Sequence, residues 1–241
     1  MPDPLRYWLV IPAAGAGRRM GAEQPKQYLP LGHRRLLDVT LQRLLDAFAF
    51  EGCMVALDAD DRWWSQCDSA ADERVATCVG GVERADSVLA ALDALADWAR
   101  PDDWVLVHDV ARPCLARGDL ERLISTLGPG TDGGLLAVPV SDTVKQALPG
   151  GERVSQTMDR STLWRAMTPQ QFRYQPLQAA LRGALRGRAP VTDESSAMEA
   201  AGYQPRLIPG RSDNLKVTVP EDLALAEWLL TRLEAQEETD R

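Results

Sequence analysis

Short apolar runs alternate with helical patterns along most of this chain, and that alternation constrains the fold more than any other feature. The apolar runs lie at residues 7–12, 53–57, 75–79, 104–108 and 133–140. Helical patterns with apolar side chains at core spacing lie at residues 36–48, 83–98 and 118–127. Strands that alternate with helices are typical of a parallel sheet covered on both faces. We therefore predict an α/β fold.

One segment departs from this alternation. Two short polar runs, at residues 143–146 and 153–157, flank the turn-forming sequence at residues 148–151. Neither run carries enough apolar surface for a central strand. We expect a protruding β-hairpin arm at about residues 141–165. An isolated hairpin is only marginally stable in water, so the arm predicts a dimer, with a plain surface hairpin as the alternative.

Composition and charge exclude several classes of protein. The chain has 241 residues and a formal net charge of −8. An acidic chain of this length is expected to form a single domain over residues 1–241 and not to bind nucleic acid. No apolar run is long enough to span a membrane, and the four cysteines include no CxxC pair. We expect a cytoplasmic protein with free thiols, a last helix over residues 220–233 and a frayed end after it.

The loop after the first apolar run has the composition of a phosphate-binding loop. Small residues at positions 13–17 allow backbone N–H groups to approach an anion, and Arg18, Arg19 and Lys26 add positive charge. Amide donors together with cations suit a triphosphate. Met20 breaks the dinucleotide-binding fingerprint, and the Gly-Lys-Ser/Thr of a P-loop is absent.

Two further loops follow apolar runs and should open on the same edge of the sheet, where open parallel sheets bind their ligands. Gly80 and Gly81 precede a helix start that carries Asp86 and Ser87. The Ser87 hydroxyl is a candidate ligand contact, and the alternative is that Asp86 or Ser87 acts as a local helix cap. Asp109 follows the fourth apolar run and is suited to Mg²⁺ or a sugar hydroxyl, with a salt bridge to Arg112 as the alternative. We interpret the neighbouring histidine as structural.

These motifs, taken together, resemble one enzyme family. The matching segments are residues 12–20, 25–28, 83–88, 108–113, 213–218 and 220–222. Their sequence and order are similar to those of the 2-C-methyl-D-erythritol 4-phosphate cytidylyltransferases of the non-mevalonate isoprenoid pathway, from about residue 7 to residue 233. The resemblance implies a Rossmann-like sheet, a homodimer whose arms are shared between active sites, and a transferase that joins CTP to methylerythritol phosphate and releases pyrophosphate.

The resemblance also implies residue roles. Arg19 and Lys26 would stabilise the transition state at the triphosphate, while Arg160 and Lys216 would place the acceptor phosphate. CTP would be held by Ala13, Ala14, Gly15, Gly17, Gly81 and Ser87. The acceptor would be lined by Asp109, Arg112, Thr143, Thr168 and Thr192. Mg²⁺ would bridge the phosphates, with Asp109 or Asp213 as a candidate ligand.

Three other functions stay open at this point. A cytidylyltransferase for ribitol 5-phosphate would keep the CTP loop and differ around Thr143, Arg160 and Thr192. A regulatory module would bind CTP without turnover, although the predicted catalytic cations are all present. A dinucleotide oxidoreductase fits least, because of Met20.

Overall fold

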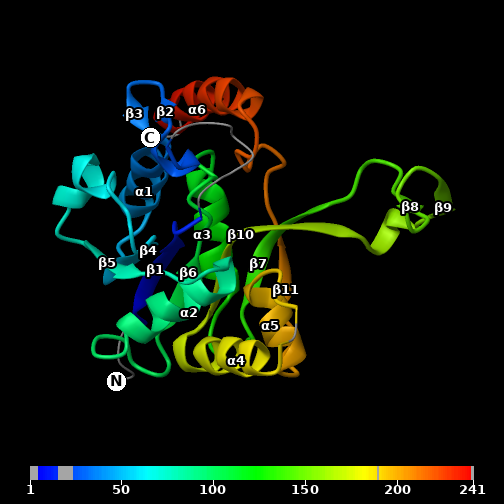
Figure 1. Ribbon diagram of the computed structural model, residues 1–241, viewed down its shortest axis with the longest axis horizontal. Helices are drawn as coiled ribbons and strands as arrows, with labels where there is room; N and C mark the ends of the chain where they lie inside the picture. The colour runs from blue at the N-terminus through cyan, green and yellow to red at the C-terminus, as the bar shows by residue number, and fades with distance from the viewer. Residues whose placement is uncertain (1–4, 16–23, 189, 240–241) are drawn as a thin grey trace.

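A seven-stranded sheet forms the centre of the molecule (Figure 1). The computed structural model describes residues 5–15, 24–188 and 190–239. The strands run in the order β11-β7-β10-β6-β1-β4-β5. Their bounds are β1 Tyr7–Pro12, β4 Gly52–Leu57, β5 Val75–Val79, β6 Trp104–Val107, β7 Gly134–Pro139, β10 Trp164–Arg173 and β11 Arg206–Pro209. The pairings are parallel except for the two that β10 makes with β6 and β7.

Helices cover both faces of this sheet (Figure 1). α1 (Leu36–Ala47) and α3 (Arg117–Thr126) lie on one face, and α2 (Arg84–Ala94), α4 (Tyr174–Arg186) and α5 (Glu194–Ala200) on the other. Strand β1 explains why both faces are apolar: Leu9 belongs to the core under α1 and α3, while Val10 belongs to the core under α2 and α4. The predicted α/β fold with a mostly parallel sheet is confirmed.

Smaller elements surround the sheet. The hairpin of β2 (Pro30–Leu31) and β3 (Arg34–Arg35) contacts the last helix, α6 (Glu221–Thr239), through a separate apolar cluster. Four single-turn 3-10 helices complete the described part: η2 Lys26–Tyr28, η3 Trp64–Gln66, η4 Asp68–Ala71 and η5 Arg160–Thr162. None of the described helices is long and apolar enough to cross a membrane.

The predicted hairpin arm stands away from the sheet (Figure 1). Strands β8 (Lys145–Ala147) and β9 (Val154–Thr157) pair antiparallel with each other and form a sheet of their own. Both strands are exposed along their whole length, and Val154 near the tip is 60% exposed. The arm thus presents apolar side chains that the rest of the described chain leaves exposed.

The structure departs from the sequence prediction at several places, and β11 and α4 are among the elements that were not predicted. Strand β10, which runs antiparallel through the middle of the sheet, was not predicted from its mixed polar sequence. The chain was expected to fray after residue 233. This was wrong, because α6 continues as a helix to Thr239. Glu237 holds that last stretch, because its carboxylate accepts hydrogen bonds from Arg43 Nη2 at 2.8 Å and from Arg117 N at 3.2 Å.

Candidate functional site

The predicted loops meet at the carboxyl edge of the sheet. The segments after β1, β5 and β6 line a pocket of about 150 Å³, together with η2 and the loop that precedes α6. Of the predicted site residues, the pocket brings together Ala13, Ala14, Gly15, Lys26, Gly81, Ser87, Asp109 and Lys216. Backbone amides and opposite charges from distant parts of the chain therefore converge on one cavity, as expected for an open parallel sheet.

The glycine-rich loop is tied to the element that carries Lys26. Ala13 N donates to Ala56 O of the neighbouring strand at 2.8 Å, which continues the sheet by one residue. The buried Gln27 side chain donates to Ala13 O at 2.6 Å. Lys26 Nζ in turn donates to Val217 O at 3.2 Å, next to Lys216. The predicted residues Gly17 and Arg19 lie outside the described residues.

The double glycine after β5 is required by close packing. A Cβ on Gly80 would lie 2.7 Å from the Ala14 Cβ and 2.9 Å from the Ser87 Oγ. A Cβ on Gly81 would lie 2.2 Å from the Asp86 Cβ. The buried Ser87 hydroxyl accepts a hydrogen bond from Gly81 N at 3.1 Å, so it holds this loop against the start of α2. The glycines allow the two loops and the helix to meet within one small cavity.

Asp86 serves as a local cap of α2. Its carboxylate accepts a hydrogen bond from Glu83 N at 3.0 Å, and the two residues form a capping box. The capping interpretation of this helix start is therefore confirmed for Asp86, while Ser87 faces both the loop and the pocket.

A cluster of charges forms the floor of the site. The Asp109 carboxylate lies 2.8 Å from Arg84 Nε, 2.7 Å from Lys216 Nζ and 3.7 Å from Arg112 Nε. Arg84 also makes a two-point contact with Glu194, at 2.7 Å and 3.1 Å. The Arg112 salt bridge considered above is thus the longest of the three ion pairs that Asp109 forms with cations in the described part of the chain.

These contacts set the protonation states of the cluster. Burial alone would raise the pKa of Asp109, but the charges of Arg84 and Lys216 outweigh it and hold the pKa well below its ordinary value. Burial would lower the pKa of Arg84, but Glu194 and Asp109 outweigh it and raise the pKa. Asp109 and Arg84 are therefore both ionised at neutral pH.

The charge cluster does not fit a protein-held metal ion. Each Asp109 oxygen already faces a cation, and both Asp213 oxygens accept hydrogen bonds from Arg211. The described part of the chain contains no group of three or more His, Cys, Asp or Glu side chains placed to hold a metal ion. Three cations around one carboxylate favour an anionic ligand instead.

His108 lies behind Asp109 and is fully buried. Its Nε2 lies 3.0 Å from Arg112 O, a carbonyl that can only accept, so Nε2 carries the proton. Nδ1 therefore accepts from the Thr168 hydroxyl at 3.1 Å, and the same oxygen accepts from Asp109 N at 3.0 Å. Burial lowers the pKa of His108 to about 4. The histidine is neutral at pH 7 and fixes the backbone that carries Asp109.

Several predicted residues lie outside the pocket lining. Thr143 and Arg160 belong to the arm and are exposed, and Arg160 donates to Ser141 O. Thr192 is exposed just before α5. Arg112 turns toward the loop before α6, where its guanidinium donates to Asn214 O at 2.7 Å.

Gln27, Arg84 and Glu194 are among the residues of the site that were given no role from sequence. Gln27 and Arg84 lie within the sequence motifs described above. The available signals were that Gln27 directly follows the predicted catalytic Lys26 and that Arg84 lies three residues after Gly81. Glu194 gave no comparable signal, because 110 positions separate it from Arg84.

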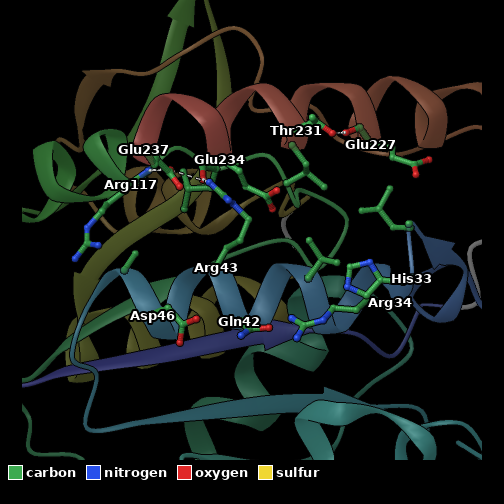
Figure 2. A pocket seen from close by; sticks show the side chains of 16 residues that line it. His33, Arg34, Gln42, Arg43, Asp46, Arg117, Glu227, Thr231, Glu234 and Glu237 are labelled. Carbon is green, nitrogen blue, oxygen red and sulfur yellow. Dashed lines mark hydrogen bonds and ion pairs between the residues drawn. The ribbon is translucent and has the colours of Figure 1, made fainter. Parts of the chain in front are cut away.

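A larger cavity lies elsewhere, between α1 and α6 (Figure 2). Its volume is about 530 Å³, and none of the predicted site residues lines it. Figure 2 shows Arg43 pointing from α1 toward Glu237 of α6, the ion pair that anchors the end of the chain. Acidic, basic and apolar side chains are mixed along its lining, and no single kind of group dominates it.

A mostly parallel sheet with glycine-containing loops and cations gathered at its carboxyl edge is typical of a nucleotide-binding α/β protein. The model of the 2-C-methyl-D-erythritol 4-phosphate cytidylyltransferase family matches residues 7–232. The chain belongs to this family.

Relatives and solved structures agree with that assignment. The chain is 56% identical over 225 residues to the 2-C-methyl-D-erythritol 4-phosphate cytidylyltransferase of Ectopseudomonas mendocina (strain ymp), covering 93% of this chain and 94% of the relative. It is 54% identical to that of Pseudomonas entomophila (strain L48), covering 94% and 95%. A crystal structure of the Francisella tularensis enzyme superposes with a TM-score of 0.80 at 34% identity, covering 93% of this chain and 99% of that one. A 4-diphosphocytidyl-2C-methyl-D-erythritol synthase structure gives 0.81 at 37% identity, covering 94% and 99%.

Proposed function

We propose that this chain is a cytidylyltransferase that joins CTP to 2-C-methyl-D-erythritol 4-phosphate and releases pyrophosphate. Family membership supports this reaction. The observation that carries the proposal is the convergence of Lys26 and Lys216 with the glycine-rich loop and the double glycine on one pocket.

The reaction is a phosphoryl substitution. An oxygen of the acceptor's phosphate attacks the α-phosphorus of CTP in line, a new P–O bond forms, and the bond to the α–β bridging oxygen breaks. The electron pair of that bond leaves with pyrophosphate. The attacking monoester is already an anion at neutral pH, so the protein needs to align two polyanions and neutralise charge rather than supply a strong base.

The proposed roles follow the pocket. The backbone around Ala13, Ala14, Gly15, Gly17 and Gly81, with Ser87, binds CTP. Arg19 and Lys26 stabilise the negative charge that builds on the triphosphate. Lys216 and Arg160 place the acceptor phosphate, and the acceptor is lined by Asp109, Arg112, Thr143, Thr168 and Thr192.

We further propose that two protomers share their arms. Arg160 lies on the arm and outside the lining of its own protomer's pocket, while the exposed arm carries uncovered apolar side chains such as Val154. Both observations favour a homodimer in which Arg160 completes the partner's site.

Mixing two inactive variants tests this arrangement. In a dimer of one Lys26→Met and one Arg160→Ala protomer, shared arms leave one site with both cations, so equal mixing should restore about a quarter of wild-type activity. Arms that serve their own protomer would restore none, which would refute the sharing.

In this proposal, Mg²⁺ is bound mainly by the phosphates of the substrate. Mg²⁺ is commonly held by substrate phosphates and few protein carboxylates, which agrees with the occupied oxygens of Asp109 and Asp213. The ion would supply charge neutralisation at the triphosphate.

We place the enzyme in the cytoplasm and treat residues 1–241 as one nucleotidyltransferase domain. The four unpaired cysteines agree with a reducing compartment. The single seven-stranded sheet agrees with one domain from which the arm projects.

Pyrophosphate release with CTP and Mg²⁺ tests the proposal, with methylerythritol 4-phosphate and ribitol 5-phosphate compared as acceptors. The proposal predicts release with the first and little with the second. Release with ribitol 5-phosphate alone would reassign the acceptor, and CTP binding without release would favour a regulatory module.

A further inference from the structure

We propose that Glu194 and Arg84 form a positioning pair that orients Asp109, and through it Lys216, for the transfer reaction. The inference rests on the proposed function, because it assigns work to residues around that same pocket. It concerns two side chains to which neither the motifs nor the family resemblance gave a role.

The four side chains form a continuous chain of contacts. Both Glu194 oxygens bind Arg84, Oε1 to Nη1 at 2.7 Å and Oε2 to Nη2 at 3.1 Å. The third guanidinium donor, Nε, reaches Asp109 Oδ1 at 2.8 Å, and Asp109 Oδ2 lies 2.7 Å from Lys216 Nζ. Each carboxylate holds one end of a cation that would otherwise rotate freely. The planar Arg84 fork therefore transmits the position of Glu194 to Asp109.

Glu194 is a fixed point because its surroundings are rigid. It is fully buried at the start of α5, and the next residue's amide, Ser195 N, donates to Gln170 Oε1 at 2.8 Å. The Gln170 amide also donates to Asp193 Oδ2 at 2.9 Å. Gln170 is itself buried in β10, the antiparallel strand beside β6. The start of α5 is thus fastened to the strand that pairs with the one carrying the Asp109 loop.

The cations at the other end are less constrained. The side chains of Arg84 and Lys216 are 28% and 39% exposed, whereas those of Glu194 and Asp109 are 0% and 9% exposed. Long side chains with access to water hold one rotamer only when a fixed partner selects it. Without Glu194, both Nη groups of Arg84 would be free to close on Asp109 and to draw its carboxylate away from Lys216.

The pair also joins the two halves of the site. Arg84 begins α2 three residues after Gly81 of the proposed CTP loop, and Glu194 lies two residues after Thr192 on the proposed acceptor side. An orientation error here would misplace the acceptor phosphate against CTP, while the CTP contacts of the glycine-rich loop would be untouched. The expected signature is a loss in kcat and in kcat/KM for the acceptor.

The test uses Glu194→Gln, which keeps the size of the side chain and removes its charge. The matched control is Asp103→Asn, because Asp103 is a buried carboxylate with an arginine partner, Arg6 at 3.3 Å, at the opposite end of β6. We expect Glu194→Gln to lower kcat about 10- to 100-fold while KM for CTP stays within about two-fold. Asp103→Asn should lower the melting temperature similarly and leave kcat near the wild-type value.

Two further variants separate positioning from a merely structural role. Glu194→Asp keeps the charge and should recover part of the lost kcat. The double variant R84Q/E194Q should be no slower than the slower single variant, because the two residues act as one unit. If Glu194→Gln does not fold, Arg84→Lys, which keeps the charge and loses the planar fork, should show the same fall in kcat.

The contrary results are distinct. Wild-type kcat in Glu194→Gln or in Arg84→Lys, or losses that multiply in the double variant, would overturn the positioning pair and leave the proposed function intact. No pyrophosphate release by the wild-type enzyme with methylerythritol phosphate would instead refute the proposed function, and with it this inference.

Discussion

Asp109→Asn removes a buried negative charge that lies 2.8 Å from Arg84 and 2.7 Å from Lys216. The substitution keeps the shape of the side chain and leaves these two cations without their shared partner. Loss of one member of a buried ion pair costs about 3–5 kcal/mol. Because Arg84 and Lys216 keep contact with water, screening reduces this, and we expect about 2–3 kcal/mol of lost stability. For a chain of this size that corresponds to a melting temperature about 4–12 °C lower.

The loss of stability caused by Asp109→Asn should depend on pH. The folded-state pKa of Asp109 lies below its ordinary value, so its contribution to stability is complete above the unfolded pKa of about 3.9 and is lost as the pH falls further. The stability difference between wild type and Asp109→Asn should be constant from about pH 5 to 8 and shrink below about pH 4.

Urea unfolding followed by tryptophan fluorescence measures both effects. Asp93→Asn is the control, since Asp93 forms an ion pair with Arg182 in which both side chains are more than 40% exposed. That surface pair should contribute less than about 1 kcal/mol. An Asp109→Asn variant as stable as wild type, or a difference that grows on acidification, would refute the reasoning.

Three other predictions concern single residues. Lys26→Met should lower kcat by about 10²- to 10³-fold with little change in melting temperature, since it removes charge stabilisation at the triphosphate; steady-state kinetics would show it. Gly80→Ala should cost about 1–3 kcal/mol in urea unfolding, because its Cβ would lie 2.7 Å from that of Ala14. His108, with its pKa lowered to about 4 from 6.5, binds fewer protons folded than unfolded, so wild-type stability should fall between pH 6.5 and 4. A His108→Asn variant should lack this part of the fall in stability when melting temperatures are compared at pH 6.5 and pH 4. The same fall in the variant as in wild type would contradict the prediction.

The parallel part of the fold could be predicted from sequence because its strands are buried on both faces. Leu9 and Val10 of β1, for example, face opposite cores, so the strand appears as a continuous apolar run. Strand β10 gives no such run. It buries Gln170 and Gln171, whose side chains form hydrogen bonds with distant residues: Gln170 Oε1 accepts from Ser195 N, and Gln171 Nε2 donates to Leu127 O. Tertiary partners, which the local sequence does not reveal, make that strand possible.

The candidate site, too, could be predicted from the sequence only in part. The loops after β1, β5 and β6 could be predicted to lie close together, because the carboxyl ends of parallel strands lie at one edge of the sheet. The contact between Arg84 and Glu194 could not, because it depends on where β10 and α5 pack. The helical end of the chain was missed for a similar reason, since Glu237 is held by Arg43 and by the backbone of Arg117.

The most direct test of the proposed reaction follows the oxygen atoms of the acceptor. Methylerythritol 4-phosphate labelled with ¹⁸O in its phosphate would be incubated with CTP, Mg²⁺ and the enzyme, and the products analysed by mass spectrometry. Attack on the α-phosphorus predicts that the CDP-linked product keeps the whole label and that pyrophosphate carries none. Label in the released pyrophosphate, or formation of CMP without a CDP-linked product, would contradict it.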